Sequence, residues 1–258
     1  MNLDHQLQAQ LKTLKLSGFL QTLDLRLKES QKASLGYLEF FQLMVQDEVE
    51  RREAKKLNLR LTKASFEEEK TLEGFDFSFN PKLNGKLIRD LGNGVFIEKQ
   101  EHVLLYGSAG VGKTHLAQAL GHQACRLGYD VLFTKAVKFF RFLLAGRADH
   151  SWEKRMKKYL APDLLIIDDF GLTPLTPIQA EDFYEIISER HLRSSIVITS
   201  NRPPQDWVAL FPDPVMAHSA LDRLAHHAHH IIMEGDSYRK KLSPKSLTPL
   251  PVKGGEFR

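Results

Sequence analysis

Near its middle the sequence reads Tyr106-Gly107-Ser108-Ala109-Gly110-Val111-Gly112-Lys113-Thr114, which matches every fixed position of the phosphate-binding P-loop pattern G-x-x-x-x-G-K-[ST]. Four apolar residues before it predict a buried strand, and apolar residues at helical spacing after Thr114 predict a helix. Glycines let backbone N–H groups turn toward an anion, and a helix N-terminus adds partial positive charge. The stretch therefore predicts a nucleoside triphosphate site. The alternative is a glycine-rich turn that fits the pattern by chance, and the flanking strand and helix argue against it.

The motif assigns a role to each residue of the loop. Lys113 is expected on the β- and γ-phosphate oxygens, and the Thr114 hydroxyl is expected to bind Mg²⁺. The residues predicted to contact the nucleotide are Gly107, Ser108, Ala109, Gly110, Val111, Gly112, Lys113 and Thr114.

A second apolar run, from Asp163 to Asp169, ends in two carboxylates. It is typical of a strand buried on both faces of a parallel sheet, with acids at the carboxyl edge. In this Walker B pattern Asp168 is predicted to hold Mg²⁺, and Asp169 is predicted to orient the attacking water. The alternative is that both acids belong to a solvated turn with Gly171.

A third strand is predicted from Ser195 onward and ends at Asn201. The Asn201 amide is a candidate to hydrogen-bond the γ-phosphate or the attacking water. An Asn before Arg202-Pro203-Pro204 is otherwise typical of a turn or cap, so the order of the three motifs carries this assignment.

The ordered set GSAGVGKT, LLIIDDF and IVITSN resembles the AAA+ ATPases, in which Asn201 matches the position called sensor 1. Within that family the chain looks most like the IstB-type helper ATPases of bacterial insertion sequences, with DnaC-type helicase loaders as close relatives. The resemblance covers nearly the full length. It is also carried by the segments 70–77, 166–172, 220–224 and 235–239. It implies an enzyme that hydrolyses ATP with Mg²⁺.

The resemblance extends to two arginines and to the end of the chain. Arg223 resembles the arginine finger that completes the site of a neighbouring subunit, although it would otherwise be taken for an ordinary helix-surface arginine. Arg239 resembles a sensor 2 arginine that touches the γ-phosphate within its own subunit. Only Asp236 to Arg258 follow the core, so the helical lid of a full AAA+ module is expected to be absent or vestigial.

The predicted fold is α/β, with an AAA+ P-loop core and a small all-helical domain before it. Five strands, at about residues 103–106, 130–134, 164–168, 195–199 and 229–233, alternate with helices, which predicts a mostly parallel sheet covered on both faces. The expected divisions are a helical domain at 1–65, a linker at 66–82, the ATPase domain at 83–245 and a flexible tail at 246–258. The linker reads as an extended connector docked on the core or as an edge strand, and the sequence does not separate these.

Composition indicates a soluble protein of the cytoplasm with no membrane partner. The chain has 258 residues and 42% hydrophobic content, and no apolar run approaches the length needed to span a bilayer. The first residues lack the pattern of a secretion signal. The single cysteine, Cys125, excludes an intramolecular disulfide.

The net charge is only +4, but the basic residues are clustered. Such clusters neutralise phosphates and give salt-dependent nucleic-acid binding, whereas a single charge run is more often a solvated helix face. The candidate DNA contacts are Arg51, Arg52, Lys55 and Lys56 at the end of the helical domain, and Lys154, Arg155, Lys157 and Lys158 after the second strand.

Two functional classes remain open. The first is a transposition helper that oligomerises on duplex target DNA in an ATP-dependent way, hydrolyses ATP and recruits or stimulates its cognate transposase. The second is a DnaC-like loader of a replicative helicase, which would hold single-stranded DNA. Full-length resemblance favours the first. A metabolic P-loop kinase is disfavoured by Asp222-Arg223 and by the basic clusters.

Overall fold

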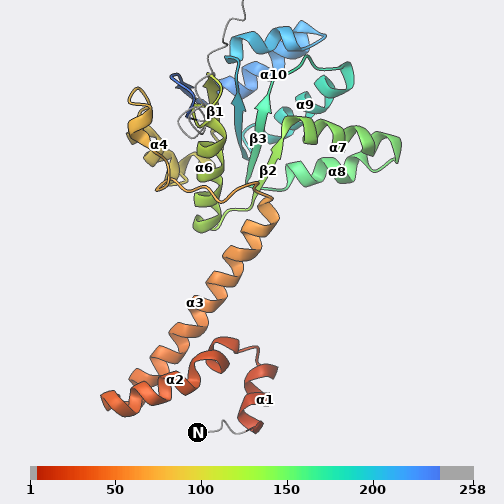
Figure 1. The fold of residues 1–258 in the computed structure, drawn as a ribbon. Coiled ribbons are helices and arrows are strands. Elements are labelled where there is room, and N and C mark those ends of the chain that lie inside the picture. The colour runs from red at the N-terminus through yellow and green to blue at the C-terminus, as the bar shows by residue number, and fades with distance from the viewer. Residues whose placement is uncertain (1–4, 239–258) are drawn as a thin grey trace, which may run out of the picture. The chain divides into compact units, whose positions relative to one another are not determined.

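The computed structural model describes residues 5–238 and divides the chain into two compact units, Met1–Ala64 and Ser65–Arg258 (Figure 1). Each unit is described by itself. The first is helical throughout its described part, as the sequence predicts. Its helices are α1 (His5–Thr13), α2 (Ser17–Ala33) and α3 (Tyr37–Ala64).

In the first unit α2 lies against α3, and the two helices are in close contact at Gly18. A Cβ on Gly18 would lie 2.7 Å from the Cα of Glu48, so only glycine permits this contact. The Gly18 N–H also donates to Glu48 Oε2 at 2.5 Å. Farther along the pair, Arg26 donates two hydrogen bonds to the buried Asp47, at 2.9 and 2.7 Å, and lowers the pKa of that carboxyl. The two helices are therefore joined by buried polar contacts as well as by apolar ones such as Met44.

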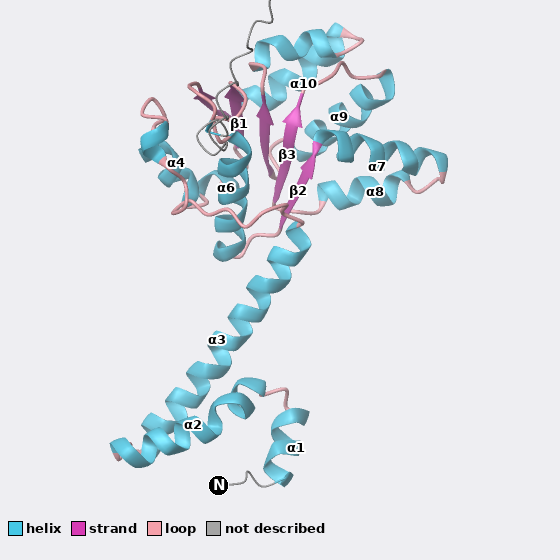
Figure 2. Ribbon diagram, in the orientation of Figure 1, coloured by secondary structure: helices cyan, strands magenta, loops and turns pink. Residues whose placement is uncertain are grey.

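The second unit is built on a five-stranded sheet in which every pair of neighbours is parallel (Figure 2). The strand order is β2-β3-β4-β1-β5. The strands are β1 (His102–Gly107), β2 (Val131–Lys135), β3 (Leu164–Phe170), β4 (Ser195–Ser200) and β5 (Ala228–Met233). The five predicted strands and their parallel arrangement are confirmed.

Helices cover both faces of this sheet. They are α4 (Gly85–Gly92), α5 (Val95–Glu98), α6 (Lys113–Leu127), α7 (Ala136–Ala148), α8 (Trp152–Leu160), α9 (Pro177–Arg190) and α10 (Pro214–His226), with 3₁₀ turns η1 (Phe77–Phe79) and η2 (Pro204–Leu210). Alternate strand residues such as Ile167 and Ile198 join one buried cluster with α7, α9 and α10. The intervening residues face α6, as the approach of Ile166 to Gly121 shows. Burial on both faces explains why these strands read as continuous apolar runs.

Three large core side chains gather beside the end of β3. Phe170 stacks on Phe183 of α9 with ring centroids 4.5 Å apart, and the ring of the fully buried Trp207 lies 4.8 Å from Phe170. Since Phe170 directly follows the two acidic residues of β3, this packing fixes the edge of the sheet where those carboxylates lie.

The connector after the helical unit contains no strand. Residues 66–82, all described, are irregular apart from η1. The expectation of an absent lid and the predicted tail at 246–258 concern residues that lie outside the described part of the chain. Within residues 5–238, no helix combines the length and the hydropathy that a membrane crossing requires.

Candidate active site

The P-loop joins β1 to α6 and has the backbone that its glycines permit. Gly107, Gly110 and Gly112 have φ angles of 132°, 79° and 98°, a region that side chains rarely adopt. A Cβ on Gly107 would lie 2.2 Å from the carbonyl oxygen of Met233 in β5. The loop therefore needs glycine both for its conformation and for its fit against the neighbouring strand.

Lys113 is the first residue of α6, and its ammonium group is held by the loop itself. Its Nζ donates to the carbonyl oxygens of Gly107 at 2.9 Å and Ser108 at 2.6 Å, and the residue is 6% exposed. The cation thus lies inside the loop, where backbone N–H groups and the start of a helix favour an anion.

Thr114 and Asp168 meet beside the loop. The Thr114 hydroxyl donates to Asp168 Oδ1 at 2.9 Å, and the Thr199 hydroxyl donates to the same oxygen at 2.6 Å. The second oxygen, Asp168 Oδ2, is buried and has no hydrogen-bond partner among the described residues. Burial raises the pKa of the Asp168 carboxyl above its usual range, against the lowering effect of the Thr199 and Thr114 hydroxyls. A buried carboxylate oxygen without a partner next to a hydroxyl is an oxygen donor set that suits Mg²⁺.

Asp169 follows at an irregularity of β3. The pairing of β3 with β4 shifts between Ile167 and Phe170, and Asp169 has a φ of 58°. Its N–H donates to the Thr199 hydroxyl oxygen at 2.9 Å rather than to a strand carbonyl. Such a bulge re-aims side chains that would otherwise alternate between the two faces of the sheet. It leaves the half-buried Asp169 carboxylate next to Asp168 at the carboxyl edge.

Asn201 lies just after β4, the strand between those that carry the P-loop and the two acids. The turn around it is fixed, because Ser200 Oγ donates to the Phe170 carbonyl at 2.8 Å and accepts from the Arg202 N–H at 3.1 Å. The Asn201 side chain is exposed at this edge. The sheet therefore brings together the three predicted motifs, which span about 95 residues of sequence.

Aromatic side chains of the connector border the P-loop. The Phe75 ring is the nearest group to Gly112, and it meets the His115 ring edge to face at 5.3 Å. Tyr238 also contacts the loop, because its N–H donates to the Gly110 carbonyl at 2.9 Å, and its ring lies 4.9 Å from Phe79 of the connector. Sequence analysis did not assign these residues to the site, because alternation of Phe with polar residues signals only an extended segment.

Arg223 does not join this group. It lies near the end of α10, shortly before β5 begins, whereas the P-loop follows the end of the parallel strand β1. Its Nη1 donates to the Tyr184 hydroxyl at 2.8 Å and to Ser188 Oγ at 2.6 Å on α9, and the guanidinium lies 5.2 Å from the Tyr184 ring centroid. Within the described chain no hydrogen bond links it to its own P-loop. Arg239, the other predicted arginine, lies outside the described residues.

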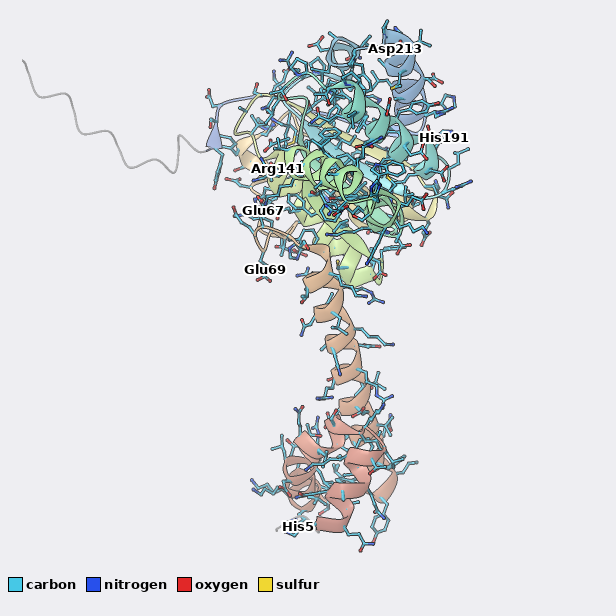
Figure 3. All side chains as sticks on the ribbon, turned by 90° about the vertical axis from the view of Figure 1, so that its right-hand side faces the viewer. His5, Glu67, Glu69, Arg141, His191 and Asp213 are labelled. Carbon is cyan, nitrogen blue, oxygen red and sulfur yellow. The ribbon has the colours of Figure 1, made fainter. Side chains whose placement is uncertain are left out.

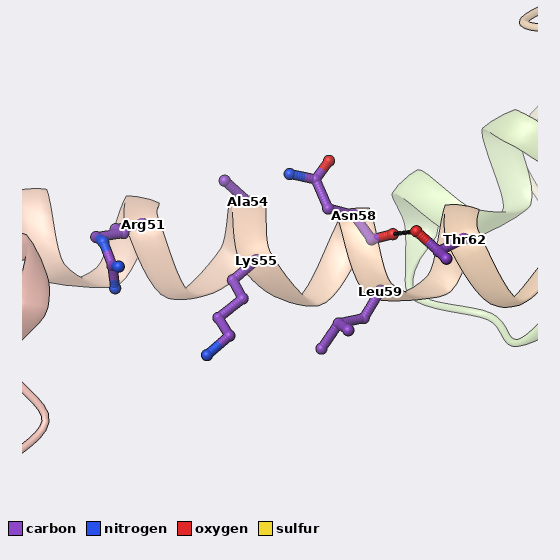
Figure 4. A pocket seen from close by; sticks show the side chains of 6 residues that line it. All are labelled: Arg51, Ala54, Lys55, Asn58, Leu59 and Thr62. Carbon is purple, nitrogen blue, oxygen red and sulfur yellow. Dashed lines mark hydrogen bonds between the residues drawn. The ribbon is translucent and has the colours of Figure 1, made fainter.

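The four predicted DNA contacts of α3 differ in their surroundings, and Figure 4 shows two of them, Arg51 and Lys55. Arg51 donates to Gln21 at 3.0 Å and also to Ser17, and Arg52 pairs with the buried Glu48 at 2.6 Å. Lys55 and Lys56 are exposed. Arg51 therefore links α3 to α2, Arg52 is paired with an acid of its own helix, and the two lysines are exposed to solvent.

The basic residues of α8 divide in the same way. Arg155 donates to Ser151 Oγ at 2.8 Å, to the Phe142 carbonyl at 2.8 Å and to Asp149 at 2.5 Å, so its guanidinium ties α8 to α7. The other three candidates, Lys154, Lys157 and Lys158, are exposed.

Two residues that contact or pair with the site's acids were missed from the sequence. Thr199 donates to Asp168 and accepts the N–H of Asp169. Lys135, at the end of β2, lies directly opposite Asp168 in the parallel pairing of β2 with β3. Thr199 stands in the motif IVITSN, but a Thr in a β-strand is so common that its type gives no functional signal.

The parallel sheet, the P-loop and the two acids on the strand beside β4 define an AAA+ P-loop ATPase. The chain belongs to the family described as IstB-like ATP binding protein, whose model matches residues 9–246.

Named relatives agree with this assignment. A Mycobacterium tuberculosis protein named for ATP binding and an insertion sequence is 46% identical over 246 residues, covering 95% of this chain and 98% of its own. The insertion sequence IS21 ATP-binding protein of Pseudomonas aeruginosa is 35% identical, covering 98% and 100%.

Solved structures show the same fold at lower identity. AMPPCP-bound DnaA from Aquifex aeolicus is similar with a TM-score of 0.56 at 24% identity, covering 69% of this chain and 54% of that one. The DnaC helicase loader is similar with a TM-score of 0.51 at 22% identity, covering 58% and 87%. The family and fold resemblances predicted from the motifs are confirmed, and the chain is an ATPase of the IstB-like ATP-binding family.

Proposed function

We propose that this protein assembles on duplex DNA when it binds ATP, hydrolyses ATP in that assembly, and recruits or stimulates the transposase of its insertion sequence. The observation that carries the proposal is the family match, which spans both units and contains the P-loop, the two acids and Asn201. Relatives named for insertion sequences match over nearly their whole length.

The residues of the site support hydrolysis by water in line with the γ-phosphate. Lys113 would leave the loop carbonyls for the phosphate oxygens, and Asn201 and Asp169 would orient the water. Thr114 and Asp168 would hold Mg²⁺, which neutralises phosphate charge when bound. Each of these residues binds, orients or accepts a proton without forming a covalent intermediate.

Arg223 is proposed to act on the site of a neighbouring copy. Its position near the end of α10 separates it from its own P-loop, and an arginine supplied by another molecule stabilises transition-state charge. Hydrolysis would then depend on assembly. The carboxylate of Asp169 is one methylene shorter than the Glu usual at this position in AAA+ proteins, so basal turnover is expected to be weak and to rise with DNA or the transposase.

DNA binding is proposed for the exposed lysines of α8 and α3. Lys154, Lys157, Lys158, Lys55 and Lys56 are exposed, whereas Arg51, Arg52 and Arg155 are engaged within the fold. Exposed lysines that contact phosphates give sequence-tolerant and salt-dependent binding. Arg239 is retained as the proposed sensor 2 residue on the strength of the resemblance alone.

The test is the size of the protein with Mg-ATP, alone, with a duplex several helical turns long, and with a single strand of the same length. Large assemblies that form only with ATP and duplex support the proposal, and Lys113→Ala should abolish them. A loader of helicases is the second candidate, favoured only by the fold shared with DnaC. Assembly on the single strand in preference to the duplex would support that candidate instead.

A further inference from the structure

The first residues of the connector are bound to the P-loop helix. The buried amide oxygen of Gln118 in α6 accepts the N–H groups of Glu67 at 3.0 Å and Glu68 at 3.1 Å. The Phe66 ring stacks on the His122 ring of the same helix, with centroids 4.2 Å apart. These contacts fix the chain directly after the helical unit to the element that begins with Lys113.

The side chain of Glu67, which is labelled in Figure 3, forms ion pairs with two lysines of other elements. One oxygen lies 2.6 Å from Nζ of Lys135 at the end of β2, and the other lies 2.9 Å from Nζ of Lys138 in α7. Both lysines lower the pKa of the Glu67 carboxyl, and Lys135 has the larger effect. One carboxylate thus neutralises two cations that do not neighbour it in sequence.

A hollow of about 240 Å³ opens beside this carboxylate. It is lined by Lys135 and Lys138, by a third lysine, Lys158 of α8, and by the rings of Phe142 and Tyr159. The Lys158 ammonium lies 5.0 Å from the Phe142 ring centroid, and no carboxylate pairs with it in the part of the chain that the structure describes. Three cations therefore face one acid, and an aromatic ring is available beside them.

We propose that this hollow is a site for a backbone phosphate of DNA, and that Glu67 occupies its two lysines while DNA is absent. This proposal rests on the DNA-binding function proposed above and names the residues at which DNA would bind. Phosphate oxygens match two converging ammonium groups as the carboxylate does, and a sugar or base suits the aromatic wall. A phosphate that takes Lys135 and Lys138 would release Glu67 from them.

Release of Glu67 from the two lysines would affect both the ATPase site and the connector. Lys135 is the residue in register with Asp168, and Glu67 is fixed to α6 through Gln118. Loss of the two ion pairs removes the contacts of Glu67 with β2 and α7, while its N–H stays bonded to Gln118 of α6. DNA occupancy is thereby coupled to the segment that precedes the nucleotide site.

The test compares duplex binding of the wild type, Glu67→Gln, Lys138→Gln and the double variant, with Glu69→Gln as the control. Glu69 is an exposed acid two residues away in the same segment, so its substitution removes the same charge without touching the lysine pair. Glu67→Gln should tighten binding about fivefold, because two partly exposed ion pairs no longer compete with the phosphate. Lys138→Gln should weaken binding and reduce the salt slope by about one. In the Lys138→Gln background the gain from Glu67→Gln should shrink, as expected for coupled residues.

Amide hydrogen exchange of the 66–68 segment gives a second readout. Exchange should quicken when DNA is added to the wild type, and it should be quick without DNA in Glu67→Gln. If duplex binds but Glu67→Gln and Glu69→Gln tighten it equally, and exchange is unchanged, the inference is wrong while the proposed function stands. If the wild type binds no duplex, or if only an acidic protein partner displaces Glu67, DNA is not the ligand of this hollow.

Discussion

At the scale of single residues, Asp168 combines a role in the site with a cost to folding. Its carboxylate is fully buried, accepts two threonine hydroxyls on one oxygen and has no described partner on the other. A buried carboxylate that forms no ion pair among the described residues is destabilising, and burial accordingly raises the pKa of Asp168. The proposed role of Asp168 is therefore to bind Mg²⁺ and not to stabilise the folded chain.

Replacing Asp168 by Asn should separate these two effects. The amide oxygen still accepts from Thr114 and Thr199, and the buried charge is gone, so the thermal midpoint without nucleotide should stay equal or rise. ATP hydrolysis should fall about 100-fold or more, since a neutral amide is a poor ligand for Mg²⁺. Thermal unfolding and phosphate release measure the two. A lower midpoint together with normal turnover would contradict this account of the site.

His102 should make stability depend on pH. Burial is the main reason that its pKa falls from 6.5 to about 4, and Arg190, His191 and His227 add to the shift. The unfolded chain therefore binds the proton more tightly, so this contribution is complete above about pH 6.5 and is lost as the pH falls through the folded value near 4. A shift of this size corresponds to about 3 kcal/mol at the acid end.

The measurement is urea unfolding between pH 7 and 4.5 for the wild type and His102→Asn. The Asn carboxamide can still accept the Ile196 N–H that now donates to His102 Nδ1 at 3.2 Å. Between pH 7 and 4.5 the free energy of unfolding of His102→Asn should fall less than that of the wild type. His218→Asn, on the exposed side of α10, should behave like the wild type. Parallel curves for all three proteins would show that His102 does not cause it.

At the scale of elements, the α7–α8 pair depends on Arg155. Its three donated hydrogen bonds end on Ser151, the Phe142 carbonyl and Asp149, and its guanidinium lies 4.6 Å from the Phe142 ring centroid. Arg155→Ala should lower the free energy of unfolding by about 2 kcal/mol, since hydrogen bonds from a charged group are lost and the exposed pair with Asp149 adds little.

Lys154→Ala is the matched control. Lys154 is exposed on the same helix, so its loss should leave stability within about 0.5 kcal/mol and weaken only DNA binding. Chemical denaturation and a duplex-binding titration distinguish the two. If both variants weaken DNA binding without any change in stability, Arg155 acts as a DNA contact and not as a clamp of the helix pair.

The sequence predicted the elements of this site more completely than the contacts between them. The apolar runs that lead to Gly107, Asp168 and Asn201 were enough to predict that these residues lie together, because parallel strands place their carboxyl ends at one edge of the sheet. The pair of Glu67 with Lys138 joins residues 71 positions apart, and its geometry depends on how α7 packs on the sheet. Composition could identify both residues as charged, but not that they neutralise each other.

At the scale of the whole molecule, a site that needs Arg223 from another copy should be restored by mixing inactive variants. Arg223→Ala keeps its own P-loop and should bind ATP without hydrolysing it, whereas Asp169→Asn keeps Arg223 and the P-loop that assembly needs but lacks the carboxylate proposed to orient the water. Mixed assemblies contain interfaces that combine the intact halves, so an equimolar mixture should recover about one quarter of wild-type turnover if subunits mix at random.

Phosphate release with duplex DNA and each variant, alone and mixed, is the measurement. Arg193→Ala is the control, because Arg193 is an exposed arginine that pairs with Glu189 of the preceding turn, and its loss should leave turnover intact. Since Arg223 also bonds Tyr184 and Ser188, the thermal midpoint of Arg223→Ala must first show that the variant is folded. A folded Arg223→Ala protein that hydrolyses ATP by itself at the wild-type rate would place all catalytic groups within one chain, and the dependence of hydrolysis on assembly would then need another cause.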